Sequence, residues 1–200
     1  ADFMESVITL EKPDNVYFTV VKNTLIYSAR NIVAGNAVKN EFDRVLWLDS
    51  DMRFPRDLIP RLSAHLDNGL DYVTGLYFTR RIPIRPNIFS ELWWKENGGD
   101  LDAGAKMIYR YPEGLCEIVA SGMGCCMMSV DLIKRVGDKV GSPFTPLDGM
   151  GEDLSFCYRV SKLGVKMYCD TSIKCDHIGQ AVYNESFYKA QGIPDDDMGV

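Results

Sequence analysis

Apolar positions recur along this chain at two spacings, which together predict an alternation of helices and strands. Helical spacing predicts helices over residues 2–10, 25–37, 55–68, 130–136 and 152–163. Short apolar runs predict strands over residues 16–21, 45–48, 72–78, 116–120, 125–129, 165–169 and 173–175. A strand, helix, strand order is typical of an α/β domain in which neighbouring strands run parallel. We therefore expect a mixed, mostly parallel sheet flanked by helices.

The length of the chain suits one domain, which we place over residues 1–200. Within it, residues 79–112 carry scattered prolines, glycines and tryptophans, and they predict an irregular insert or lid. Residues 183–200 read as a C-terminal tail that ends in acidic residues. A hydrophobic content of 46% is enough to fill a core.

Charge and cysteine content narrow the functional classes. The net charge of −6 argues against nucleic acid as the main partner, because binding to a phosphate backbone rests on clustered Lys and Arg. The six cysteines lack zinc-type spacing, so buried free thiols in a reducing, cytoplasmic compartment are expected rather than disulfides. No apolar stretch is long enough to predict a transmembrane helix.

The pattern Asp-x-Asp occurs three times, at 49–51, 100–102 and 195–197. The first of these pairs directly follows a continuous apolar run, which is typical of a strand covered on both faces. Ligands of open α/β sheets bind beyond the carboxyl ends of the strands. Side chains alternate along a strand, so Asp49 and Asp51 are expected to point the same way. We interpret this pair as a candidate metal site.

Other polar residues have both a functional and a structural interpretation. Arg30 and Asn31 lie inside a predicted helix and either bind a ligand or face solvent. Gly151 precedes Glu152 and Asp153, which either act chemically or stabilise a helix N-terminus through its dipole.

Three further features are equally open. Gly122 lies in a small-residue turn at 121–124, where backbone approaches a ligand closely or packs internally. His177 follows a strand and is either a metal ligand or a strand-end histidine. Trp93 and Trp94 either stack on a sugar ring or fill a core, and His65 is interpreted as structural.

The order and spacing of several segments resembles a family 2-type glycosyltransferase with the GT-A fold. The resemblance covers about residues 25–178. The segments are ARN at 29–31, VLWLDSDM at 45–52, VTGLYFTRR at 73–81, SGMGCCMMS at 121–129, PF at 143–144, GEDLSFCYRVSKLGVKMYCD at 151–170 and the late His177. One departure is that the family's usual first strand, which binds the nucleotide base, has no counterpart here.

The resemblance implies transfer of a sugar from a UDP- or GDP-linked donor to a hydroxyl of a glycan or other acceptor. It implies that Asp49 and Asp51 hold a divalent metal on the donor diphosphate, with Asp49 also near the ribose. It further implies that His177 is a third metal ligand, which favours Mn²⁺ over Mg²⁺. Asp153, or else Glu152, resembles the base of inverting members.

The remaining donor contacts are expected from Arg30, Asn31 and Gly122, and more weakly from Arg80 and Arg81. Two other functional classes stay open at this point. One is a sugar-phosphate nucleotidyltransferase, although the expected glycine-rich N-terminal loop is not seen. The other is a non-catalytic module that binds a nucleotide-sugar or a glycan.

Overall fold

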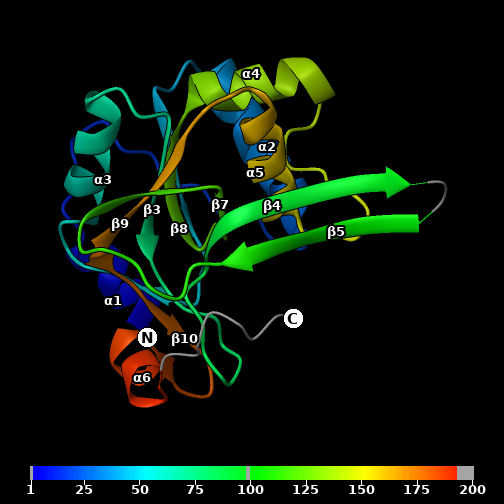
Figure 1. Ribbon diagram of the computed structural model, residues 1–200. Helices are drawn as coiled ribbons and strands as arrows, with labels where there is room; N and C mark the ends of the chain where they lie inside the picture. Colours follow the sequence, from blue (N-terminus) through cyan, green and yellow to red (C-terminus); the bar gives the residue numbers. More distant parts are fainter. Residues whose placement is uncertain (1, 98–99, 193–200) are drawn as a thin grey trace.

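A five-stranded mixed sheet forms the centre of the structure, a computed structural model that describes residues 2–97 and 100–192 (Figure 1). Its strands, in spatial order, are β1 (Arg44–Leu48), β8 (Cys125–Ser129), β3 (Tyr72–Leu76), β9 (Met167–Lys174) and β6 (Leu115–Ile118). Only the β3–β9 pair in this sheet is parallel.

The prediction of mostly parallel neighbours is therefore wrong. The strand, helix, strand rhythm correctly indicates that β1 and β3 run in the same direction, since both are antiparallel to β8. What the rhythm does not show is that β8, which comes later in the chain, lies between them. Adjacency in a sheet is set by long-range packing, which local sequence spacing does not record.

Helices cover both faces of this sheet, as the continuous apolar strands predict (Figure 1). One face packs against α1 (Asp2–Thr9) and α3 (Leu58–Asp67). The other packs against α2 (Ile26–Lys39), α4 (Val130–Val140) and α5 (Glu152–Lys162). Side chains of β8 alternate between the two cores: Cys125 and Met127 face the first, and Cys126 and Met128 face the second.

Residues 79–112 contain regular structure where an irregular insert is predicted. β4 (Ile88–Asn97) and β5 (Asp100–Met107) form a long antiparallel hairpin that extends away from the central sheet, with β7 (Ala120–Ser121) on its other edge (Figure 1). Trp93 lies opposite Gly104, and its indole N–H donates to Asp102 at 2.7 Å. Cross-strand pairs of this kind stabilise a hairpin despite its glycines.

Trp94 packs the same hairpin against α5 and the loop that precedes it. Its indole N–H donates to the carbonyl of Asp148 at 3.0 Å, and its ring lies 6.1 Å from that of Tyr158 in α5. Both tryptophans therefore have structural contacts. Of the other two Asp-x-Asp motifs, the one at 100–102 belongs to this hairpin, and 195–197 lies outside the described residues.

The strand expected over residues 16–21 is also wrong. That segment has no regular structure, and Tyr17, Phe18 and Val20 are exposed. Its β-branched and aromatic residues favour a strand, but no sheet edge pairs with it, and an unpaired strand is not stable in water. The two short strands expected over 165–169 and 173–175 form the single strand β9.

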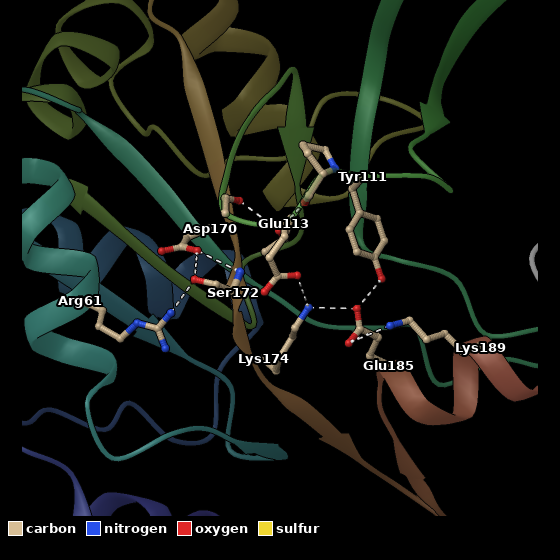
Figure 2. A network of polar contacts seen from close by, with 11 residues as sticks. Arg61, Tyr111, Glu113, Asp170, Ser172, Lys174, Glu185 and Lys189 are labelled. Atoms are coloured by element: carbon tan, nitrogen blue, oxygen red, sulfur yellow. Dashed lines mark hydrogen bonds and ion pairs between the residues drawn. The ribbon is translucent and has the colours of Figure 1, made fainter.

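Polar side chains of β9 form hydrogen bonds and ion pairs with the helices α3 and α6 (Figure 2). Ser172 accepts a hydrogen bond from Arg61 of α3 at 2.6 Å, and Lys174 reaches Glu185 of α6 (Glu185–Ala190) at 2.9 Å. His65 lies 2.9 Å from Asp170, in agreement with its structural interpretation. The six cysteines are free, and all except Cys116 are buried. None of the described helices is long and apolar enough to span a membrane.

Candidate functional site

A small three-stranded sheet places the Asp49–Asp51 turn beside the end of the chain's last long strand. The turn connects β1 to β2 (Met52–Arg53), and β2 pairs with β10 (Asp176–Ile178), which in turn pairs with β11 (Val182–Tyr183). This register places His177 opposite Met52. The N–H of Ile178 also donates to the carbonyl of Asp51 at 2.7 Å. The sheet therefore joins two segments that lie far apart in the sequence.

Asp49 and Asp51 lie after the strand rather than within it, so strand alternation does not set their directions. The N–H of Asp49 donates to Gly124 at 3.0 Å, and its carbonyl accepts from Met52 at 3.1 Å, which closes the turn. Burial is the largest cause of the raised pKa of Asp49, and the charge of Asp51 is near enough to add to that rise. Each carboxylate has its own set of partners.

Asp49 belongs to a partly buried ion-pair cluster centred on Arg30 of α2, whose own side chain is buried. Arg30 Nη2 lies 3.2 Å from Asp49 Oδ1, and Arg30 Nε lies 3.3 Å from Glu152 Oε1 at the start of α5. Burial lowers the pKa of Arg30, but the neighbouring acidic groups outweigh it and the net shift is upward. The guanidinium also lies 5.3 Å from the ring of Trp47, a cation–π contact. Arg30 thus ties α2, β1 and α5 together.

Asp51 belongs to a second cluster, with His177 and Arg80. His177 Nε2 lies 3.6 Å and Arg80 Nη1 2.7 Å from Asp51 Oδ2. The other carboxylate oxygen, Oδ1, is buried and has no hydrogen-bond partner among the described residues. His177 Nδ1 lies 2.8 Å from the carbonyl of Phe78, which can only accept, so Nδ1 carries the proton. In the neutral ring the lone pair then lies on Nε2, on the side of Asp51.

Asp51 and His177 carry donor atoms of the kinds that a divalent cation takes when few protein ligands hold it. An orphaned carboxylate oxygen and an imidazole nitrogen of fixed tautomer are suitable donors, and such ions commonly take one or two carboxylates plus substrate phosphates. Within residues 2–97 and 100–192, no group of three or more His, Cys, Asp or Glu side chains is arranged to hold a metal. Asp49 Oδ1 is committed to Arg30, so its role as a metal ligand stays a prediction.

Asp153 and Glu152 begin α5 next to the Arg30 cluster. The backbone N–H of Leu154 donates to Asp153 Oδ1 at 2.7 Å, so Asp153 takes part in the helix N-terminus as the structural interpretation requires. Burial raises the pKa of Asp153, and the charge of Glu152 adds to that rise. Burial likewise raises the pKa of Asp49, against the opposing effect of Arg30. A carboxylate of raised pKa is a stronger base at neutral pH.

Two predicted donor-binding residues are engaged inside the fold. Asn31 Oδ1 accepts a hydrogen bond from the N–H of Phe144 at 3.0 Å, and so joins α2 to the loop that leads to α5. Gly122 is buried, and a β-carbon there would lie 2.2 Å from both Asn87 Nδ2 and the hydroxyl of Tyr77. The space beside Gly122 is thus taken up by protein side chains.

Tyr77 and Asn87 support the site and are not among the site residues that the sequence predicts. The Tyr77 hydroxyl accepts hydrogen bonds from the N–H of Gly124 at 3.0 Å and from Asn87 at 2.8 Å. Its ring meets that of His177 edge-on at 5.7 Å. Tyr77 follows an apolar strand and looks like an ordinary core residue in the sequence. Its contacts with Gly124 and Asn87, which lie in different loops, become visible only once the strands are paired.

Comparisons with known proteins inform the fold and leave the chemistry open. No protein-family model matches the sequence, and no curated protein matches it. Among solved structures, the crystal structure of A197 from STIV is similar, with a TM-score of 0.59 at 17% identity. The alignment covers 89% of this chain and 77% of that chain. At this identity the likeness shows a shared fold alone: a mixed α/β architecture with a mixed sheet flanked by helices.

Proposed function

We propose that this protein is a metal-dependent glycosyltransferase of the GT-A type, related to family 2, that moves a sugar from a nucleotide-sugar to an acceptor hydroxyl. The observation that carries the proposal is the convergence of four acids and a histidine. Asp49, Asp51, Glu152, Asp153 and His177 come from three separate segments and meet around the turn after β1. These are the acids and the histidine that the sequence resemblance selects.

In this proposal Asp51 and His177 hold the metal, with Mn²⁺ favoured over Mg²⁺ because an imidazole is present. When bound, the cation stabilises the negative charge that develops on the leaving diphosphate. The tautomer of His177 is fixed by Phe78, so its Nε2 needs no rearrangement to serve as a ligand. Arg30 holds Asp49 in place, toward the ribose of a UDP- or GDP-linked donor.

Asp153 is the proposed base that takes the proton from the acceptor hydroxyl, with Glu152 second. Glu152 Oε1 is paired with Arg30 Nε at 3.3 Å, so this carboxylate is engaged within the fold. Its negative charge in turn raises the pKa of Asp153. A positioned carboxylate base contributes roughly 10²–10⁴-fold to a rate. Glu152 is thus the acid that binds Arg30, and Asp153 is the acid that accepts the proton.

One observation favours the second candidate, a non-catalytic module that binds nucleotide-sugars. Arg80 lies 2.7 Å from Asp51 Oδ2, so a guanidinium already neutralises the acid that a metal would need. Arg80 is half-exposed, and an exposed ion pair of this kind is worth only about 0–1 kcal/mol. An arriving cation therefore meets little resistance from it. Because the Arg80–Asp51 pair does not prevent Asp51 from binding a metal, we place the metal-dependent enzyme before the binding module.

A panel of UDP- and GDP-linked sugars with Mn²⁺ tests the proposal. Ligands that bind only the folded protein raise its unfolding temperature, so the panel first identifies the donor. Product analysis then separates the candidates. Release of a nucleoside diphosphate supports the glycosyltransferase, and release of pyrophosphate from a nucleoside triphosphate and a sugar phosphate supports a nucleotidyltransferase. Binding without any product supports the module.

A further inference from the structure

A pocket of about 650 Å³ opens beside the Asp51–His177 pair. Most of it is formed by the loop between β3 and β4, and His177 contributes to its wall. Three of its lining residues are arginines, Arg80, Arg81 and Arg85, and none of its described lining residues is acidic. This concentration of positive charge stands out in a chain whose net charge is −6.

Among the described residues, two of the three arginines have no counter-charge. Arg80 pairs with Asp51 and also approaches the carbonyl of Ile178 at 3.5 Å. The guanidinium groups of Arg81 and Arg85 have no ion pair or side-chain hydrogen bond within the part of the chain that the structure describes. With respect to the described side chains, the donors of both guanidinium groups are available to a ligand.

The loop that carries these arginines is held in shape from both sides. At its base the N–H of Thr79 donates to the carbonyl of Arg85 at 2.9 Å, and the N–H of Arg85 donates to Thr79 Oγ1 at 3.1 Å. Next to this base, the side chain of Gln191 accepts from the N–H of Ile84 at 2.7 Å and donates to the carbonyl of the same residue. A loop backbone held in this way lowers the ordering cost on binding, which then falls mainly on the arginine side chains.

We infer that this pocket binds a phosphate or diphosphate group of a substrate through Arg81 and Arg85. The planar guanidinium forms paired hydrogen bonds with phosphate oxygens. Several arginines together match the multiple negative charge of a phosphate better than they match the single charge of a carboxylate. The pocket is larger than a single phosphate needs, so the rest of the ligand lies in it as well. The inference deepens the proposed function and rests on it for the identity of the substrate, although the binding itself requires neither metal nor turnover.

Inorganic pyrophosphate is the probe, titrated calorimetrically at constant ionic strength with EDTA present so that no metal contributes. Wild-type protein is expected to bind it saturably, and the double variant Arg81→Gln/Arg85→Gln at least tenfold more weakly. The matched control is Arg56→Gln/Arg110→Gln, which removes the same charge from arginines outside the pocket lining. It is expected to stay within twofold of the wild type.

Lack of saturable binding by the wild type, or equal weakening in both double variants, overturns the inference. Arg81 is exposed and Arg85 half-buried, so both variants are expected to fold, and unfolding temperatures without ligand verify this. If the double variant is unstable, Arg81→Gln alone must still weaken binding, and wild-type affinity in it equally overturns the inference.

A further titration distinguishes two sources of the phosphate, the nucleotide-sugar donor and a phosphorylated acceptor. Pyrophosphate is added to protein saturated with UDP or GDP and Mn²⁺. Competition assigns the pocket to the donor diphosphate, and simultaneous binding assigns it to a phosphorylated acceptor. Because the first titration excludes metal, its failure is separate from a failure of the glycosyltransferase proposal, which rests on Asp51 and product release.

Discussion

Asp51 Oδ2 lies 3.6 Å from His177 Nε2, although the two residues come from opposite halves of the chain. The pairing of β2 with β10 creates this proximity, and the hydrogen bond of His177 to Phe78 directs the free nitrogen toward the carboxylate. The relationship makes the pair the proposed cation site.

If His177 is a ligand, His177→Gln weakens Mn²⁺ binding at least tenfold in the presence of a nucleoside diphosphate. Loss of outer-shell partners alone typically costs 10–100-fold in metal affinity, so loss of a direct ligand should cost no less. Electron paramagnetic resonance of free Mn²⁺ measures the affinity. His65→Gln is the matched control, because His65 contacts Asp170 instead. Equal Mn²⁺ affinity in the two variants contradicts the assignment.

Arg30→Met is expected to lower the free energy of unfolding by about 1–3 kcal/mol, because it leaves Asp49 and Glu152 without their counter-charge. The value lies below that of a fully buried pair because the Asp49 side chain is 37% exposed. Urea denaturation measures the loss. Arg44→Met removes a more exposed pair with Asp67 and should cost under about 1 kcal/mol. Equal losses in both variants would show that burial does not strengthen the Arg30 cluster.

Asp153→Asn should stabilise the protein at neutral pH while abolishing turnover. The pKa of Asp153 is raised in the fold, so its ionised form opposes folding at pH values above that pKa. This cost fades as the pH falls through the raised pKa toward the unfolded value of about 3.9. The unfolding temperature of the variant should therefore exceed that of the wild type at pH 7, and the difference should shrink toward pH 4.

The exposed Asp148, in the loop before α5, supplies the control for that experiment. Asp148→Asn is expected to follow the wild type at every pH. A destabilised Asp153→Asn at pH 7 would mean that the helix N-terminal hydrogen bond to Leu154 outweighs the cost of the buried charge.

Gly122→Ala should destabilise the protein by about 1–3 kcal/mol, since its methyl group would overlap Asn87 and Tyr77 in a packed interior. Gly35→Ala is the contrasting variant. It lies in α2 with nothing within 4 Å of a β-carbon, and should stabilise by up to about 1 kcal/mol. Thermal unfolding measures both. A neutral Gly122→Ala would indicate that the Tyr77–Asn87 contact is easily displaced.

The sequence predicted elements better than it predicted their neighbours. Helical periodicity located α2, α4 and α5, and apolar runs located β1, β3 and β8. The antiparallel insertion of β8 and the β4–β5 hairpin were missed because strand pairing depends on contacts between distant residues. The segment at 16–21 shows the reverse case, in which a local preference finds no partner.

The acidic residues of the candidate site could be predicted from the sequence, but the contacts that hold them in place could not. Asp49 and Asp51 could be selected because they directly follow an apolar strand, and Glu152 and Asp153 because they open a helix. The central position of Arg30 between Asp49 and Glu152 depends on three elements meeting, which no spacing encodes. The internal contacts of Asn31 and Gly122 likewise become visible only in three dimensions.

Release of a nucleoside diphosphate from a nucleotide-sugar, followed with Mn²⁺ for the wild type and for Asp51→Ala, decides whether Asp51 supports metal-dependent glycosyl transfer. We predict Mn²⁺-dependent release by the wild type and a loss of at least a hundredfold in Asp51→Ala, with an unfolding temperature close to that of the wild type. Wild-type release by Asp51→Ala would contradict it.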